Sequence, residues 1–95
     1  MIFCMTVAEP DPGADAALEA YIARIAEGDK DALAGLYGRT RPAIYGFALS
    51  VVKNAHDAED ILHDVYLQVW NAAAGYRAQG KPMAWLLTIT RNLAI

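Results

Sequence analysis

An all-α fold of about four helices is the fold class that the sequence predicts, on three observations. Nineteen of the 95 residues are alanine, the residue with the highest helix propensity, and only four are proline. Apolar residues recur with the three- and four-residue spacing of a helix in four segments, and no segment alternates as a strand does. The length suffices for one small domain and excludes the larger α/β enzyme folds.

The first predicted helix spans residues 15–27. Its apolar stripe consists of Leu18, Tyr21, Ile22, Ile25 and Ala26. Gly28 follows, and glycine is the residue that most often occupies the left-handed position after a helix. Residues 1–13 precede this helix and end in a stretch that contains two prolines and a glycine, so we expect them to form a flexible tail.

The second predicted helix opens at Asp29, an N-cap type of residue, and stops at Asn54. Asp31 lies in its first turn, where the helix dipole favours a negative charge. The apolar positions are Leu33, Leu36, Tyr37, Ile44, Phe47, Ala48, Val51 and Val52. Pro42 lies inside this pattern and lacks an amide hydrogen, so we expect it to kink or split the helix near Arg41.

The third segment, residues 56–74, has the most regular pattern and predicts a long amphipathic helix. Its apolar stripe consists of Ala58, Ile61, Leu62, Val65, Tyr66, Val69, Trp70 and Ala73. The opposite face carries Asp57, Asp60, His63, Asp64, Leu67, Gln68 and Asn71. A loop over residues 75–81 follows, and Pro82, a residue favoured in the first turn, begins a fourth helix that runs to the last residue. That helix has one stripe of Leu86, Ile89, Thr90 and Leu93 and another of Trp85, Thr88, Arg91 and Asn92.

Several function classes lack support in the sequence. A single cysteine, Cys4, excludes a disulfide framework and any metal site with more than one cysteine ligand. There is no glycine-rich phosphate loop and no nucleophile elbow, so we expect neither an enzyme nor a cofactor. His56 and His63 share a face with Asp60 and Asp64, which geometrically allows a metal or acid–base cluster, but a solvated polar face is the more common arrangement.

Hydropathy gives an expectation for the compartment. No apolar run approaches the ~18 residues of a membrane span, and the short apolar start, Met1 to Met5, lacks the basic region and the length of a secretory signal. We therefore expect a cytoplasmic protein without membrane insertion.

The net charge of −3 at first argues against nucleic acid as a partner. The charges are unevenly distributed, however, because residues 1–64 hold all eleven acids and five bases, whereas residues 65–95 hold three bases and no acid. The basic segment also holds aromatic and hydrogen-bonding side chains, so its candidate contacts to nucleic acid are Tyr76, Arg77, Lys81, Trp85, Thr88, Arg91 and Asn92. Cations track phosphates and rings stack on bases, a combination that suits a single strand, although Trp85 can equally be a core residue.

Two segments resemble the motifs of a known family when they are taken in order. Residues 56–70, HDAEDILHDVYLQVW, resemble region 2.2 of bacterial sigma-70-type sigma factors. Residues 82–94, PMAWLLTITRNLA, resemble the Trp-Leu to Arg-Asn-Leu-Ala stretch of regions 2.3 and 2.4, and Gly28 to Ala48 is similar to region 2.1. Spacing and order match the extracytoplasmic-function, or group IV, class best. The resemblance covers about residues 16–95, so residues 14–95 are expected to form a region 2 domain.

This resemblance implies a compact helical domain of a transcription initiation factor, which docks on the clamp helices of the RNA polymerase β′ subunit. It assigns the polar face of the third helix to the polymerase, with contacts expected at Asp60, His63, Asp64, Leu67, Gln68 and Asn71. Carboxylates there can pair with arginines of the partner, and Leu67 offers an apolar anchor. His63 departs from the glutamine usual in the family, but a neutral histidine also donates and accepts hydrogen bonds.

The resemblance assigns the basic segment to the promoter −10 element, which the family recognises and melts by capturing the non-template single strand with one base flipped into a pocket. Tyr76 falls where the family often places a loop aromatic that lines this pocket. Asn92 matches the asparagine of Arg-Asn-Leu-Ala and can read a base edge. Arg77, Lys81 and Arg91 are expected to contact phosphates, which sets affinity and salt dependence rather than sequence preference.

Two points stay open in the sequence. No segment resembles the helix-turn-helix domain, region 4, with which complete group IV factors read the −35 element, so we expect a truncated piece of a longer protein. The domain can alternatively be a protein-interaction module alone, held by an anti-sigma factor or used as a helical adaptor, without a DNA role. Titration with a −10-like single strand against a scrambled strand distinguishes the two hypotheses.

Overall fold

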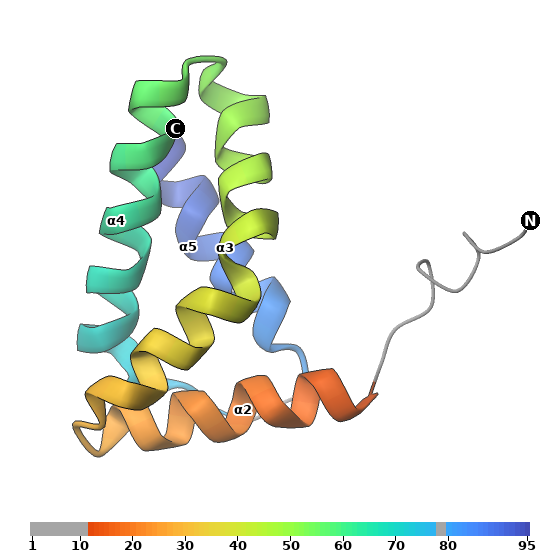
Figure 1. Ribbon diagram of the computed structural model, residues 1–95, viewed down its shortest axis with the longest axis vertical. Helices are drawn as coiled ribbons and strands as arrows, with labels where there is room; N and C mark the ends of the chain where they lie inside the picture. The colour runs from red at the N-terminus through yellow and green to blue at the C-terminus, as the bar shows by residue number, and fades with distance from the viewer. Residues whose placement is uncertain (1–11, 78–79) are drawn as a thin grey trace, which may run out of the picture.

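The computed structural model describes residues 12–77 and 80–95, and the regular elements in these ranges are all helices (Figure 1). The elements are α2 (Pro12–Ala26), α3 (Lys30–Val52), α4 (Ala55–Ala72), the 3-10 helix η1 (Ala73–Gly75) and α5 (Pro82–Ala94). The predicted all-α class is therefore confirmed. Within the described ranges, no helix combines the length and the hydropathy needed to cross a bilayer.

The observed boundaries differ from the predicted ones by a few residues. Helix α2 begins at Pro12, so Pro12 and Gly13 of the predicted tail are helical, whereas residues 1–11 lie outside the described residues. The end of the third predicted helix narrows from α-helix to the 3-10 turn η1, which reaches Gly75. Terminal turns often tighten in this way, because the last carbonyls can bond only within a shorter ring.

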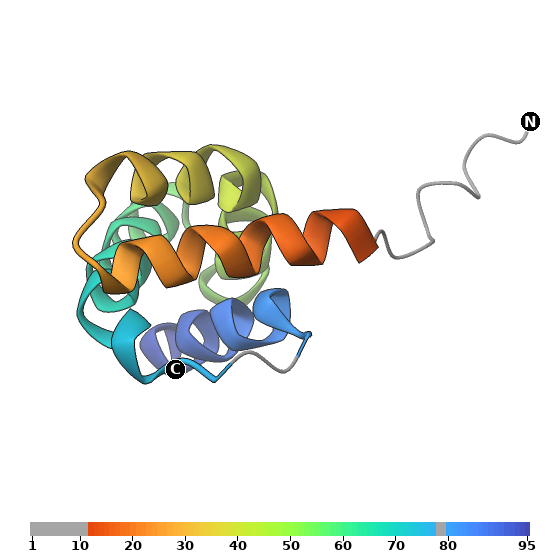
Figure 2. The same ribbon diagram turned by 90° about the horizontal axis from the view of Figure 1, so that it is seen from below.

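Helices α3 and α4 form an antiparallel pair, α5 lies behind both, and α2 runs across one end of the pair (Figures 1 and 2). Helix α3 contacts each of the other three α-helices. Helix α2 also contacts η1 and α5, so it lies beside the two elements that flank the loop at residues 76–81. This placement of α2 matters for the site described below.

The core lies where the apolar stripes of the four helices meet. The predicted stripe of α4 and η1 is confirmed, because its buried positions are Ala58, Ile61, Leu62, Val65, Tyr66, Val69 and Ala73. The remaining position, Trp70, is half-buried. The other helices contribute Leu18, Ile22, Ile25, Leu36, Ile44, Ala48, Leu86 and Ile89. Three predicted stripe positions, Ala26, Val51 and Leu93, are instead exposed, because each lies in the last turn of its helix.

The turn between α2 and α3 follows the predicted chemistry. Gly28 has φ +89°, and the amide of Asp29 donates back to the Arg24 carbonyl at 3.1 Å, which closes the end of α2. Oδ1 of Asp29 then caps α3 by accepting from the amides of Asp31 and Ala32. The bond from the Ala32 amide and the pairing with the Arg24 side chain lower the pKa of Asp29.

Two predictions about α3 are refined by the structure. The helix changes direction in its middle but stays continuous, so Pro42 bends it without splitting it (Figure 1). The helix ends at Val52, and Lys53 takes the left-handed conformation with φ 57°. Asn54, which we predicted to end α3, instead caps α4 by accepting from the Asp57 amide at 3.0 Å.

Candidate functional site

The outer face of α4 carries all six residues that the sequence assigned to a protein partner. The buried stripe of α4 occupies the opposite side, so residues at the complementary positions face solvent. All six are exposed, namely Asp60, His63, Asp64, Leu67, Gln68 and Asn71, and we call them the α4 face. Leu67 is 65% exposed, and because a single exposed leucine is ordinary, its significance depends on what lies beside it.

An apolar groove of about 500 Å³ adjoins the α4 face, between α3 and α4. Its walls are Lys30, Leu33, Ala34, Tyr37, His63, Tyr66, Leu67 and Trp70. The exposed Leu67 therefore continues into a strip of half-buried apolar side chains, the kind of surface that an amphipathic helix can fill. Sequence analysis placed Leu33, Tyr37 and Trp70 only on core stripes, whereas the structure leaves all three half-buried and open to the groove.

A buried hydrogen bond supports the floor of the apolar groove. Thr40 Oγ1 donates to the Leu36 carbonyl at 2.7 Å, so its oxygen accepts from the hydroxyl of Tyr66. Burial raises the pKa of Tyr66, because a phenolate at this position would lose its hydration. The ring of Tyr66 also packs edge-on against Tyr37, with centroids 4.9 Å apart and planes at 72°. Helices α3 and α4 are thus joined by polar and aromatic contacts directly under the groove.

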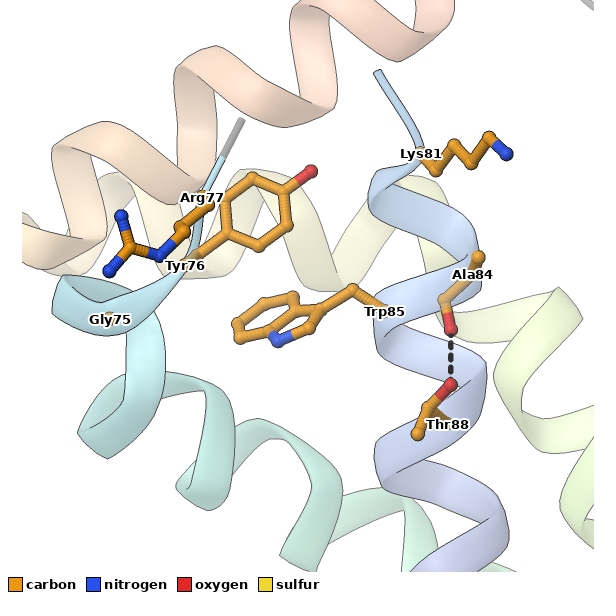
Figure 3. A pocket seen from close by; sticks show the side chains of 7 residues that line it. All are labelled: Gly75, Tyr76, Arg77, Lys81, Ala84, Trp85 and Thr88. Carbon is orange, nitrogen blue, oxygen red and sulfur yellow. Dashed lines mark hydrogen bonds between the residues drawn. The ribbon is translucent and has the colours of Figure 1, made fainter. Parts of the chain in front are cut away.

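A second concavity, of about 380 Å³, lies between the end of η1 and the first turns of α5 (Figure 3). Its lining residues are Gly75, Tyr76, Arg77, Lys81, Ala84, Trp85 and Thr88. Five of the seven residues predicted to contact DNA are among them, although they come from two separate segments. We call this concavity the basic hollow, because the exposed Arg77 and Lys81 lie on its two sides.

Two aromatic rings form the inner wall of the basic hollow. The ring centroids of Tyr76 and Trp85 are 4.7 Å apart, and the ring planes are tilted by 53°. Both side chains are half-buried and pack against the core, while part of each ring borders the hollow. Trp85 therefore packs against the core and also lines the hollow, so its position leaves it accessible as the predicted contact to nucleic acid.

The hydroxyl of Tyr76 points away from Trp85 and toward α2 (Figure 3). It donates to Oε2 of Glu19 at 2.7 Å, and the backbone amide of Gly80 donates to the same oxygen at 2.9 Å. Sequence analysis missed Glu19, because it precedes Tyr76 by 57 residues and looks like any polar position of an amphipathic helix. No spacing along the chain could have identified it.

The two remaining DNA candidates, Arg91 and Asn92, do not line the basic hollow. Both are exposed in the last turn of α5, and Asn92 lies one turn beyond Thr88. The hydroxyl of Thr88 donates to the Ala84 carbonyl at 2.8 Å (Figure 3), and its oxygen retains the capacity to accept a hydrogen bond. The predicted DNA face therefore extends along α5, but only its first half borders the hollow.

The histidines of α4 form no compact cluster with their acidic neighbours. His56 Nε2 lies 3.7 Å from Asp60 Oδ2, and the two side chains are 85% and 67% exposed. Such a solvated contact contributes little, because water screens it on all sides. Among residues 12–77 and 80–95, no three histidine, cysteine, aspartate or glutamate side chains are grouped as metal ligands would be.

Comparisons with known proteins give a consistent result. The profile of the family Sigma-70 region 2 matches residues 36–95. The ECF RNA polymerase sigma factor SigK of Mycobacterium sp. (strain KMS) is 42% identical over 79 residues, which cover 82% of this chain and 41% of that protein. Its namesake in Mycobacterium ulcerans (strain Agy99) is 38% identical over 85 residues, or 88% of this chain and 46% of the relative.

A relative of lower identity matches a similar share of the chain. The SigK protein of Mycobacterium tuberculosis (strain ATCC 25177 / H37Ra) is 33% identical over 79 residues, which cover 82% of this chain and 42% of that protein. The chain thus spans less than half the length of each of these three relatives. No solved structure gives a significant match.

Proposed function

The chain belongs to the sigma-70 region 2 family, and from this premise we propose that it serves transcription initiation as the domain of an extracytoplasmic-function sigma factor that binds RNA polymerase and a promoter strand. Sigma factors act by binding and are not enzymes. The observation that carries the proposal is the basic hollow, because it brings predicted DNA contacts from two chain segments onto one surface. The α4 face and the apolar groove supply a separate surface for the polymerase.

The basic hollow suits a base that has left the stack of the −10 element. The rings of Tyr76 and Trp85 offer an aromatic wall, and stacking of a base on such a ring contributes about 1–3 kcal/mol. Arg77 and Lys81 on either side can hold the flanking phosphates of the non-template strand. Beyond the hollow, the exposed Asn92 can read the edge of a neighbouring base.

Two asparagines allow a matched test of the DNA contacts. We expect Asn92→Ala to weaken binding of a −10-like single strand, whereas Asn71→Ala, at a position of the α4 face that is also exposed, should not. Tyr76→Ala should weaken binding about tenfold, because it removes a stacking surface. Fluorescence titration at two salt concentrations measures both effects, with circular dichroism as the check on helicity. Equal binding by Asn92→Ala, Tyr76→Ala and the unmodified chain would remove these residues from the site.

The α4 face suits the clamp helices of the β′ subunit. Asp60 and Asp64 lie one turn apart and are exposed, so both can pair with arginines of a partner helix. Leu67 and the apolar groove beside it can take the apolar side chains of the same helix. Buried apolar anchors ringed by polar contacts are the usual composition of a strong interface.

Charge reversal tests this surface. The double variant Asp60→Lys with Asp64→Lys should lose binding to the β′ clamp helices in a pull-down while it stays folded. The control, Asp15→Lys with Glu27→Lys, changes the net charge by the same amount near the two ends of α2 and should bind normally. Unchanged capture by the first variant would refute the assignment of the α4 face to the polymerase.

The apolar groove also favours the second hypothesis, a module that binds only proteins. An anti-sigma factor could fill the groove with an amphipathic helix as well as the polymerase could. The two hypotheses differ at the basic hollow, which a pure protein-interaction module would not use. Binding to the β′ clamp helices or to an anti-sigma factor, without binding to a −10-like strand at either salt concentration, would favour the second hypothesis.

A further inference from the structure

A carboxylate of α2, that of Glu19, accepts hydrogen bonds from the loop beside the basic hollow but does not line the hollow itself. Oε2 of Glu19 accepts from the Tyr76 hydroxyl at 2.7 Å and from the Gly80 amide at 2.9 Å. These two donors lie on opposite sides of the loop that joins η1 to α5. One oxygen atom therefore connects both ends of the loop to a helix that does not itself line the hollow.

The two bonds restrain Tyr76 in a specific way. Its ring meets Trp85 at a centroid distance of 4.7 Å, and its hydroxyl is bound to Glu19 at the far end (Figure 3). A ring that packs against Trp85 and is hydrogen-bonded through its hydroxyl presents a fixed surface for stacking. Charge-assisted bonds of this kind are roughly twice as strong as neutral ones. Gly80, with φ +76°, adopts a backbone conformation that other residues rarely take, and its amide is turned toward the same carboxylate.

We propose that Glu19 is a positioning residue of the promoter-strand site, which holds the Tyr76 ring and the Gly80 backbone so that the basic hollow can discriminate between bases. This inference rests on the proposed function, because it needs a single strand in the hollow. Glu19 does not line the hollow, and it acts through the two groups that it orients. Pre-ordering a binding surface improves affinity because less freedom is lost on binding.

The sign of the effect separates this role from simple electrostatics. A carboxylate close to an anionic strand repels it, so electrostatics alone predicts that removal of Glu19 tightens binding. Positioning predicts the opposite, namely weaker binding and poorer discrimination between bases. Glu27, the exposed residue directly after α2, provides the matched control, because Glu27→Ala removes the same charge but neither of the two hydrogen bonds to the loop.

The experiment uses the whole chain and labelled oligothymidine strands that carry one central adenine, cytosine or guanine. Fluorescence anisotropy at two salt concentrations gives the affinity for each strand. We expect Glu19→Ala to bind the preferred strand about tenfold more weakly than Glu27→Ala and to compress the differences between strands. Glu19→Gln should fall between, because its amide oxygen can still accept both bonds without the charge. The salt slope should stay unchanged, since the contacts of Arg77 and Lys81 to phosphates remain.

Tyr76→Phe tests the link between the two residues. It keeps the ring beside Trp85 but removes the hydroxyl, and it should weaken binding about threefold. If Glu19 acts through this hydroxyl, the combined loss of Glu19→Ala with Tyr76→Phe should be smaller than the product of the single losses. Thermal unfolding of every variant verifies that the fold is intact, and Glu19→Gln gives a comparison close to the native shape.

The outcomes are distinct. If the unmodified chain binds none of the strands, the promoter-strand part of the proposed function is refuted and this inference with it, whereas the charge-reversal variants test the polymerase part separately. If the unmodified chain binds and Glu19→Ala binds as tightly as Glu27→Ala or more tightly, only the positioning role is refuted. Uniform weakening on all strands, with the differences between bases preserved, also refutes it.

Discussion

The bond between Thr40 and Tyr66 connects α3 to α4 beneath the apolar groove, and the substitution Thr40→Val tests its contribution. Valine has nearly the shape of threonine, so the packing around the position is retained. The hydroxyl of Tyr66, whose side chain is only 6% exposed, loses its acceptor and has little access to water. The perturbation is therefore the loss of the two hydrogen bonds of the Thr40 hydroxyl, to Tyr66 and to the Leu36 carbonyl, and not the creation of a cavity.

The magnitude follows from the surroundings of each hydroxyl. A buried hydroxyl left without a partner costs about 1–3 kcal/mol. In a domain of this size each kcal/mol lowers Tm by about 4–8 °C, so Thr40→Val should unfold roughly 5–20 °C below the unmodified chain. Tyr66→Phe should cost less, because Thr40 keeps its bond to the Leu36 carbonyl. The double variant Thr40→Val with Tyr66→Phe leaves no hydroxyl unsatisfied and should regain part of the loss.

Thermal and urea unfolding, followed by circular dichroism, give the four free energies of unfolding and the coupling between the two sites. The expected order of stability is the unmodified chain, then Tyr66→Phe, then the double variant, with Thr40→Val last. A double variant that is less stable than Thr40→Val by the full cost of Tyr66→Phe would show that the hydroxyls act independently. That result would refute the reasoning from an orphaned Tyr66.

Three further predictions concern stability. The raised pKa of Tyr66 means that the folded state favours the neutral phenol. The resulting contribution to stability is present below the ordinary pKa of 10.0 and is lost as pH rises through the folded pKa. Tyr66→Phe should therefore flatten the fall in Tm at alkaline pH. The lowered pKa of Asp29 has the opposite sign, because its contribution is present above the ordinary value of 3.8 and is lost as pH falls through the folded pKa. Asp29→Asn, which keeps a capping oxygen, should weaken the acid dependence of Tm, and an unchanged acid limb would contradict the assigned cause. Gly28→Ala should lower the free energy of unfolding by about 1 kcal/mol, because φ +89° strains a side chain even though no atom lies within 4 Å of the added carbon; an unchanged urea midpoint would argue against this.

Of the two neighbouring surfaces on α4, the sequence could predict one and not the other. The α4 face could be predicted, because helical periodicity alone places Asp60, Asp64 and Leu67 on the side opposite the buried stripe. The apolar groove could not, because a half-buried residue such as Trp70 has the same spacing as a fully buried one. Whether a stripe residue is covered depends on how closely the neighbouring helix packs.

By itself the sequence determined the helices, the turn between α2 and α3 with its cap, and the family. These are local properties: Gly28, Asp29 and Asn54 act on the backbone within a few residues, and the motifs of α4 and α5 are contiguous. Only the tertiary structure decided which segments share a surface. It brought Tyr76 to Trp85 and set Glu19 of α2 against the loop behind them, 57 residues away from Tyr76. The physical reason is that the hydrophobic effect, which packs the helices together, is non-directional. Polar groups that meet as a result of this packing therefore show no regular spacing in the sequence.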